Sequence, residues 1–190
     1  MPKISASTVA EHHEIQHQQV LDVALALIES SRGAVPAVGE VAKMVGLARS
    51  SVYQYISSKQ DLVAQLLTRF LKQWAEEVAA AMDAAGSDPW ARLDAYIESN
   101  LELFTQWQGD ALMLAAAQTP GIFQVEQVHQ AHLALNPSLV QSLTDAGMEK
   151  QEATVYASIL DSAIHSGAKL ILEGRDRAVV RHALSRMLDF

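Results

Sequence analysis

The stretch of sequence that decides the fold is VGEVAKMVGLARSSVYQYISSKQDL, residues 38–62. Within it, Ala42, Gly46 and Val52 follow one another at intervals of four and six residues, which is the spacing of a helix-turn-helix. The small Ala42 lets two helices cross closely, and Gly46 permits the positive φ of a tight turn. Val52 then buries a branched side chain between the two helices. The stretch therefore predicts a short helix before Gly46 and another one after it.

Helical patterns fill the rest of the chain, and no segment alternates apolar and polar residues as a half-buried strand would. Helix starts are predicted by capping residues at Thr8–Glu11, Ser58–Asp61 and Ser87–Pro89. We predict an all-α fold of about nine helices, with an N-terminal three-helix helix-turn-helix domain and a larger C-terminal helical bundle. The expected domain bounds are 1–57 and 58–190, with the helix over 58–86 as connector.

A polar face is expected on the third helix, which we predict over residues 48–55. Arg49 can pair with guanine or a phosphate, Gln54 can bridge N6 and N7 of adenine, and hydroxyl groups suit phosphates. Lys59 lies at the start of the next helix, where backbone amides favour a phosphate. The candidate DNA-contacting residues are Arg49, Ser50, Ser51, Tyr53, Gln54, Tyr55 and Lys59.

The formal net charge of −8 does not exclude DNA binding, because the charge is unevenly distributed. Residues 1–60 hold equal numbers of basic and acidic side chains, so the whole surplus of acid lies in the remainder. The first third of the chain is therefore the part that would not repel a phosphate backbone.

The same residues resemble the N-terminal domain of TetR-family transcriptional regulators, over roughly residues 9–65. The resemblance rests on Val41-Ala42, Gly46, Tyr53 to Ile56, Ser58-Lys59 and Leu62. It implies a homodimeric DNA-binding regulator, usually a repressor, whose C-terminal bundle holds a small-molecule effector. The chain departs from the family pattern at residues that usually cap helices or touch phosphate, so its operator contacts would differ; these residues are Ala37, Val38, Gly39 and Ala48.

A dimer is also expected on physical grounds, because one short helix reads only a few base pairs. Two copies about 34 Å apart on a palindromic operator are needed for useful specificity. In the family the last two helices usually form the dimer. The candidate interface residues here are Ala153, Ala157, Leu160, Ile164, Ala168, Val179, Ala183 and Met187, and intramolecular core is the alternative for them.

Aromatic and methionine side chains in the C-terminal segments are candidates for binding a largely apolar effector. Any one of them could instead be plain core. The hypothesis is that effector binding moves the helix over 58–86 and separates the two reading helices. The candidate residues are Trp74, Met82, Tyr96, Phe104, Trp107, Met113, Phe123, His129 and Tyr156.

Other classes of function receive less support from the sequence. Without cysteine there is no disulfide or cysteine metal cluster, and no apolar run has the length of a membrane span, so a cytoplasmic protein is expected. We expect no metal or cofactor, because Glu126, His129 and His132, or His13 and His17, lack visible further ligands. No nucleophile and base are paired, so no enzyme is expected. A helical protein-interaction module and a small metal- or cofactor-dependent enzyme remain alternatives, and a steep fall of affinity with salt would favour DNA binding.

Overall fold

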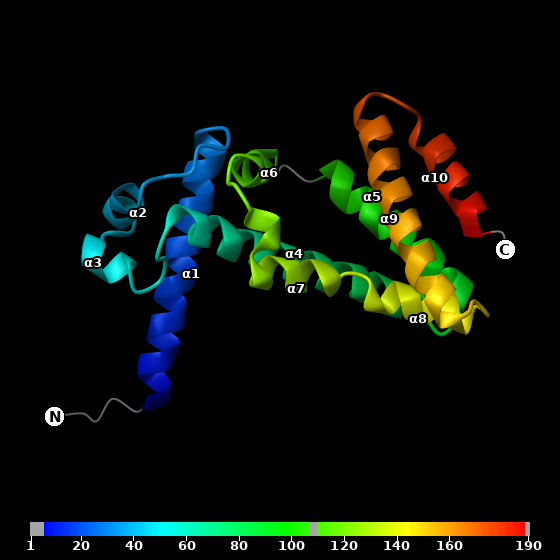
Figure 1. Ribbon diagram of the computed structural model, residues 1–190, viewed down its shortest axis with the longest axis horizontal. Helices are drawn as coiled ribbons and strands as arrows, with labels where there is room; N and C mark the ends of the chain where they lie inside the picture. Colours follow the sequence, from blue (N-terminus) through cyan, green and yellow to red (C-terminus); the bar gives the residue numbers. More distant parts are fainter. Residues whose placement is uncertain (1–5, 107–109, 189–190) are drawn as a thin grey trace. The chain divides into compact units, whose positions relative to one another are not determined.

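The structure is a computed structural model that describes the backbone of residues 6–106 and 110–188, and every regular element in these ranges is helical (Figure 1). This confirms the all-α prediction. The elements are α1 (Ala6–Ser30), α2 (Val38–Val45), α3 (Arg49–Val52), α4 (Lys59–Ala84), α5 (Pro89–Gln106), α6 (Asp110–Ala117), η1 (Ile122–Gln124), α7 (Glu126–Leu133), α8 (Pro137–Asp145), α9 (Lys150–Leu172), α10 (Arg177–Ser185) and η2 (Arg186–Leu188).

The described residues form two compact units. The first unit takes its residues from 1–69 and 108–129, and the second takes its residues from 70–107 and 130–190. Helix α4 therefore contributes residues to both units. The functional boundary after residue 57 stays a prediction. The sequence did not predict that α6 and η1 belong to the same compact unit as the N-terminal helices.

Local capping explains where the helices of the first unit begin and end. Gly46 has a φ of 79°, and its amide donates to the Ala42 carbonyl, so α2 ends at the predicted turn. At the start of α4, the Asp61 amide donates to the Ser58 hydroxyl over 3.0 Å. Helix α1 begins at Ala6, two residues before the predicted start at Thr8, because nothing in residues 6–8 interrupts the helical backbone.

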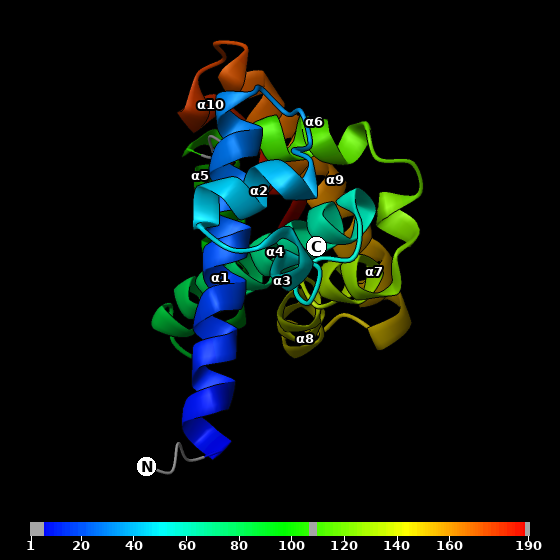
Figure 2. The same cartoon turned by 90° about the vertical axis from the view of Figure 1, so that its left-hand side faces the viewer.

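The core of the first unit joins α1, α2, α3 and the first half of α4, and Figure 2 shows α2 beside α1. Apolar side chains from each helix are buried there, which fixes the angle at which α3 is held. The buried residues include Val20, Leu21, Ala24 and Ile28 of α1, Val38, Val41 and Ala42 of α2, Val52 of α3, Ile56, and Leu62, Val63 and Leu66 of α4.

In the second unit, α9 packs against α5, α8 and α10. The Glu149 carboxylate caps α9 by accepting from the amides of Gln151 and Glu152, and Asp176 caps α10 in the same way. Helices α9 and α10 approach closely at Gly167, where an added Cβ would lie 2.9 Å from Val180 Cγ1. The close packing of α10 therefore depends on a residue without a side chain.

Five residues of the expected dimer interface are core residues of this unit. They have exposed fractions of 0–2%, and they lie in the apolar cluster that α9 shares with α5 and α8. The structure thereby corrects the assignment of these five residues to the dimer interface, because their side chains offer no surface to a second copy. A stripe of small and aliphatic residues packs equally well inside a helical bundle. The five residues are Ala153, Ala157, Leu160, Ile164 and Ala168.

Candidate DNA-contacting surface and ligand site

Helix α3 is shorter than predicted. The expected helix over residues 48–55 consists of four α-helical residues followed by a tighter turn, in which the Gln54 amide donates to the Ser51 carbonyl. The Ala48 side chain cannot cap the helix, and no side-chain cap is present. Two buried side chains hold the segment, Val52 at the end of α3 and Ile56 after the turn, and each is 0% exposed.

The outward face of this segment consists of Arg49, Ser50, Tyr53 and Gln54, all of which are exposed. Arg49 Nη2 donates to the Tyr53 hydroxyl over 3.2 Å, and the guanidinium carbon lies 5.7 Å from the centre of the Tyr53 ring. This arrangement keeps a cation and a phenol together at the surface. Ser51 is half-buried and contributes less to this face.

Tyr55 points toward α1 rather than away from the unit. Its hydroxyl donates to Gln16 Oε1 over 2.8 Å. Its ring stacks on His17 with centroids 5.7 Å apart, and it lies 4.7 Å from the ring of His13. Tyr55 therefore supports the outward face from behind, and these contacts oppose its expected role as a DNA contact.

Side chains at the start of α4 complete this support. Gln65 Nε2 donates to the Tyr55 carbonyl over 2.9 Å, while Gln65 Oε1 lies 2.6 Å from His17 Nε2. Burial raises the pKa of Asp61, but hydrogen bonds from the Ser57 amide and from the Gln65 and Ser57 side chains outweigh it, so the pKa lies below its usual value. Tyr55 is thus held by groups from both α1 and α4.

The start of α2 differs from a phosphate site. Ala37 has no capping side chain, and its amide donates instead to Glu40 Oε2 over 2.7 Å. This places a negative charge where a phosphate would otherwise find free amides. Lys59 Nζ donates over 2.8 Å to the carbonyl of Val35, two residues before Ala37, which leaves two of its three protons for another acceptor.

A polar and aromatic seam lies between α5 and α9 in the second unit. Tyr96, Asn100 and Phe104 recur every four residues on α5, and Asp161 and His165 do so on α9. The Tyr96 hydroxyl donates to Asp161 Oδ1 over 2.5 Å. The rings of Phe104 and His165 meet edge to face with centroids 5.1 Å apart. The two helices therefore pair residue by residue along one face, which we call the α5–α9 seam.

Trp74 of α4 closes this seam. Its indole N–H donates to Asn100 Oδ1 over 2.9 Å, and its ring centre lies 4.6 Å from that of Phe104. Phe70 extends the aromatic series, with its ring centre 5.3 Å from that of Trp74. Trp74 is 7% exposed, whereas Phe104 is half-buried, so the aromatic series runs from the core toward the surface.

The electrostatics of the seam centre on Asp161. Burial raises the pKa of this carboxyl, and hydrogen bonds from Tyr96 and Asn136 together with the nearby His132 oppose the rise only in part. Burial, with the charge and hydrogen bond of Asp161, also raises the pKa of Tyr96. Hence Tyr96 is a hydrogen-bond donor that retains its proton, and Asp161 is an acid in an environment that disfavours its charge.

The structure brings together only part of the expected ligand site. Trp74, Tyr96 and Phe104 meet at the α5–α9 seam. Met82 is fully buried in the core. Three other candidates, Met113, Phe123 and His129, are exposed in the first unit, and Trp107 lies outside the described residues. Sequence reasoning missed Asn100, Asp161 and His165, whose only signal is the four-residue spacing within each helix.

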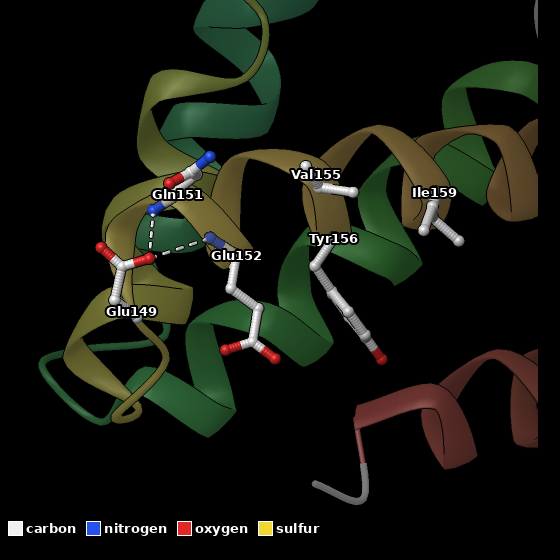
Figure 3. Close-up of a pocket in the computed structure, with 6 residues that line it drawn as sticks. All are labelled: Glu149, Gln151, Glu152, Val155, Tyr156 and Ile159. Carbon is white, nitrogen blue, oxygen red and sulfur yellow. Dashed lines mark hydrogen bonds between the residues drawn. The ribbon is translucent and has the colours of Figure 1, made fainter.

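Tyr156 lies on a different face of α9, in the open pocket drawn in Figure 3. The pocket has a volume of about 510 Å³, and its lining comes from the first turns of α9 and the residue before it. Val155 and Ile159 are 59% and 52% exposed there, which leaves apolar surface uncovered within the single chain. The lining residues are Glu149, Gln151, Glu152, Val155, Tyr156 and Ile159.

Metal ligation and membrane crossing have no support within the described part of the chain. Neither Glu126 with His129 and His132, nor His13 with His17, belongs to a group of three or more residues there that could hold a metal ion. Among those same residues, no helix combines the length and the apolar character needed to cross a bilayer.

Several solved structures share this fold. The TetR-like regulator LfrR from Mycobacterium smegmatis, in complex with proflavine, is 20% identical with a TM-score of 0.57, and the match covers 95% of this chain and 96% of LfrR. FadR from Bacillus subtilis with stearoyl-CoA is 15% identical with a TM-score of 0.66, over 90% and 96% of the two chains. AibR with isovaleryl coenzyme A and operator DNA is 16% identical with a TM-score of 0.64, over 90% and 97%.

These similarities establish the fold and extend over nearly the whole chain. The protein has the fold of TetR-like transcriptional regulators, as the resemblance in residues 9–65 led us to expect. No protein-family model and no curated protein sequence matches the chain.

Proposed function

We propose that the protein is a homodimeric transcriptional repressor that binds a palindromic operator and is released by a small, largely apolar effector. The observation that carries the proposal is the exposed face of Arg49, Ser50, Tyr53 and Gln54. This face stands on a helix-turn-helix whose third helix is anchored by the buried Val52. Arg49 and Gln54 are the side chains that can read guanine and adenine edges. A regulator of this kind would act in the cytoplasm.

Support for DNA and effector as partners comes from proteins of the same fold. AibR was captured with both operator DNA and isovaleryl coenzyme A, and LfrR with proflavine. The low identities transfer the fold and not the ligand, so the chemistry of the effector has to be argued from the residues of this chain.

The proposed dimer uses the uncovered faces of α9 and α10. Val155 and Ile159 are exposed on α9, and Val179 of α10 is 68% exposed. Ala183 is exposed one turn after Val179. Ile159→Asp would place a charge in this apolar surface, and we expect sedimentation equilibrium to show a weakened dimer. If the dissociation constant of the dimer were the same in wild type, Ile159→Asp and Val179→Asp, this interface would be wrong.

The effector site that we propose is the α5–α9 seam with Trp74. Because α4 contributes residues to both units, an effector that displaces Trp74 would move a helix that also supports Tyr55 through Gln65. The tryptophan fluorescence of the protein should then respond to a true effector, and Trp74→Phe should remove most of that response. Release of DNA without movement of α4 would contradict this mechanism.

A genome-wide selection of binding sites with the purified protein tests the proposed function. We expect a palindromic sequence whose affinity falls steeply with added salt, as phosphate contacts require. Arg49→Ala or Gln54→Ala should cost about 1–3 kcal/mol and relax preference at one operator position, whereas Lys59→Ala should weaken all sequences alike. If no sequence is enriched, the helix-turn-helix is structural and the alternative of a protein-interaction module is favoured.

A further inference from the structure

Packing does not explain the carboxyl of Asp161 in the α5–α9 seam. It is a half-buried carboxyl whose surroundings raise its pKa, so its charge opposes folding. Among residues 6–106 and 110–188, no arginine or lysine forms an ion pair with it. Its partners are the neutral hydroxyl of Tyr96 and the side-chain amide of Asn136, and the charge of His132 acts on it in addition. An aliphatic or amide side chain would be more stable at this half-buried position.

The neighbours of Asp161 form a surface suited to an aromatic body. His165 lies one helical turn further along α9, on the same face, and packs against Phe104. Phe104 in turn contacts Trp74. His165 is exposed and Phe104 is half-buried, so this end of the seam is open to solvent. An acid beside a short series of aromatic rings offers both a counter-ion and ring faces to a cation.

We propose that the α5–α9 seam recognises a positively charged organic effector, an amine or amidine on a flat apolar body, with Asp161 as its counter-ion. This inference rests on the effector role proposed above and names the chemical class of the ligand. Tyr96 and Asn136 orient the Asp161 carboxylate by hydrogen bonds, while Phe104 and Trp74 pack against the apolar body. An anionic ligand such as an acyl-CoA would meet a like charge at this position.

Calorimetry on the purified full chain tests the proposal with three tricyclic probes of similar shape: the cation proflavine, the neutral acridone and the anion acridine-9-carboxylate. DNA is left out because proflavine itself binds DNA. The test variant is Asp161→Asn, which removes the charge but keeps an acceptor for the Tyr96 hydroxyl. The matched control is Glu102→Gln, which removes an equal charge from the exposed face of α5.

We expect the wild type to prefer proflavine, and Asp161→Asn to weaken proflavine about ten- to a hundredfold while acridone changes less than twofold. Glu102→Gln should leave all three unchanged. Thermal melts at neutral pH should show Asp161→Asn to be folded, with a midpoint above that of the wild type. Equal loss in both variants, no preference for the cation, or tighter binding of the anion would each overturn the proposal.

Failure of this inference and failure of the proposed function give different results. If binding-site selection yields an operator but the cation does not bind through Asp161, the regulator stands and the effector is of another class. If the cation binds through Asp161 but no operator is enriched, the seam is a ligand site in a protein that does not regulate transcription.

Discussion

The turn at Gly46 and the glycine at position 39 provide a matched test of the helix-turn-helix. Both glycines belong to α2 or its C-cap, and a Cβ added at either would meet no atom within 4 Å. They differ in backbone conformation: Gly46 has a φ of +79°, whereas Gly39 lies within the helix. Substituting alanine for each glycine therefore adds the same methyl group without steric contact and isolates the cost of the backbone conformation.

The two substitutions should change the free energy of unfolding in opposite directions. Gly46→Ala forces an L-residue into the left-handed region and should destabilise by about 1–2 kcal/mol. Gly39→Ala replaces glycine in a helix and should stabilise by about 0.5–1 kcal/mol. The difference between the variants is then about 1.5–3 kcal/mol, which urea unfolding resolves easily.

Circular dichroism during urea unfolding would measure the change in the free energy of unfolding of the whole protein. Hydrogen exchange of the α2 amides would show whether the change in stability is confined to the helix-turn-helix. Exchange should accelerate in α2 for Gly46→Ala and slow for Gly39→Ala. If Gly46→Ala were neutral or stabilising, the turn would not adopt the left-handed conformation, and the orientation of α3 that follows from it would be wrong.

Three further predictions concern packing and charge. Gly167→Ala should destabilise the protein by about 1–3 kcal/mol in thermal melts, because the new Cβ would lie 2.9 Å from Val180 Cγ1 and 3.1 Å from Leu184 Cδ1; an unchanged midpoint would contradict the close approach of α9 and α10. Burial alone would raise the pKa of Glu98, but the hydrogen bonds and charges of Arg177 and Arg181 outweigh burial and lower this pKa overall. Glu98 therefore stabilises the folded state at pH values above its unfolded pKa of about 4.3, and this stability is lost as pH falls through the folded pKa. Glu98→Gln should lower the midpoint at neutral pH and flatten its decline in acid, and parallel pH curves would refute this. Glu40→Gln should strengthen binding to all DNA sequences alike by reducing charge at the start of α2, and a sequence-specific or absent effect in anisotropy titrations would place Glu40 away from phosphate.

The elements that short-range signals define could be predicted from the sequence. Gly46 ended α2 at the expected residue, and Ser58 with Asp61 opened α4, since turns and caps depend on residues a few positions apart. The third helix was overestimated in length, because periodicity does not distinguish an α-helix from the tighter turn that follows Val52. These successes and errors both arise from local geometry.

What each helix face contacts could be predicted less accurately than where the helices begin and end. The stripe from Ala153 to Ala168 has the pattern of a packed helix, and a buried core and a dimer surface require the same pattern. Tyr55 has a hydroxyl that suits DNA, yet Gln16 and His17 of α1 hold it inward across 39 and 38 positions of sequence. Such contacts appear only when distant helices are brought together.

The α5–α9 seam could likewise not be predicted from the sequence. In the sequence Asp161 resembles any exposed acid on a helix, and its hydrogen bond with Tyr96 appears only when α5 places Tyr96 opposite it. Aromatic residues could be proposed from their type, and Trp74 and Phe104 do meet, but Met113 and Phe123 lie in the other compact unit. Residue type therefore predicted part of the proposed effector site, and the pairing of α5 with α9 determined the rest.

The exposed face of α3 is proposed to read DNA sequence, and the proposed function depends on it. The most direct test compares wild type and Gln54→Ala on the selected operator and on copies that carry each single base change, by fluorescence anisotropy. The account predicts that wild type loses about 1–3 kcal/mol at one A·T position in each half-site and that Gln54→Ala loses this discrimination there and nowhere else. Identical discrimination profiles for Gln54→Ala, Arg49→Ala and wild type would contradict it.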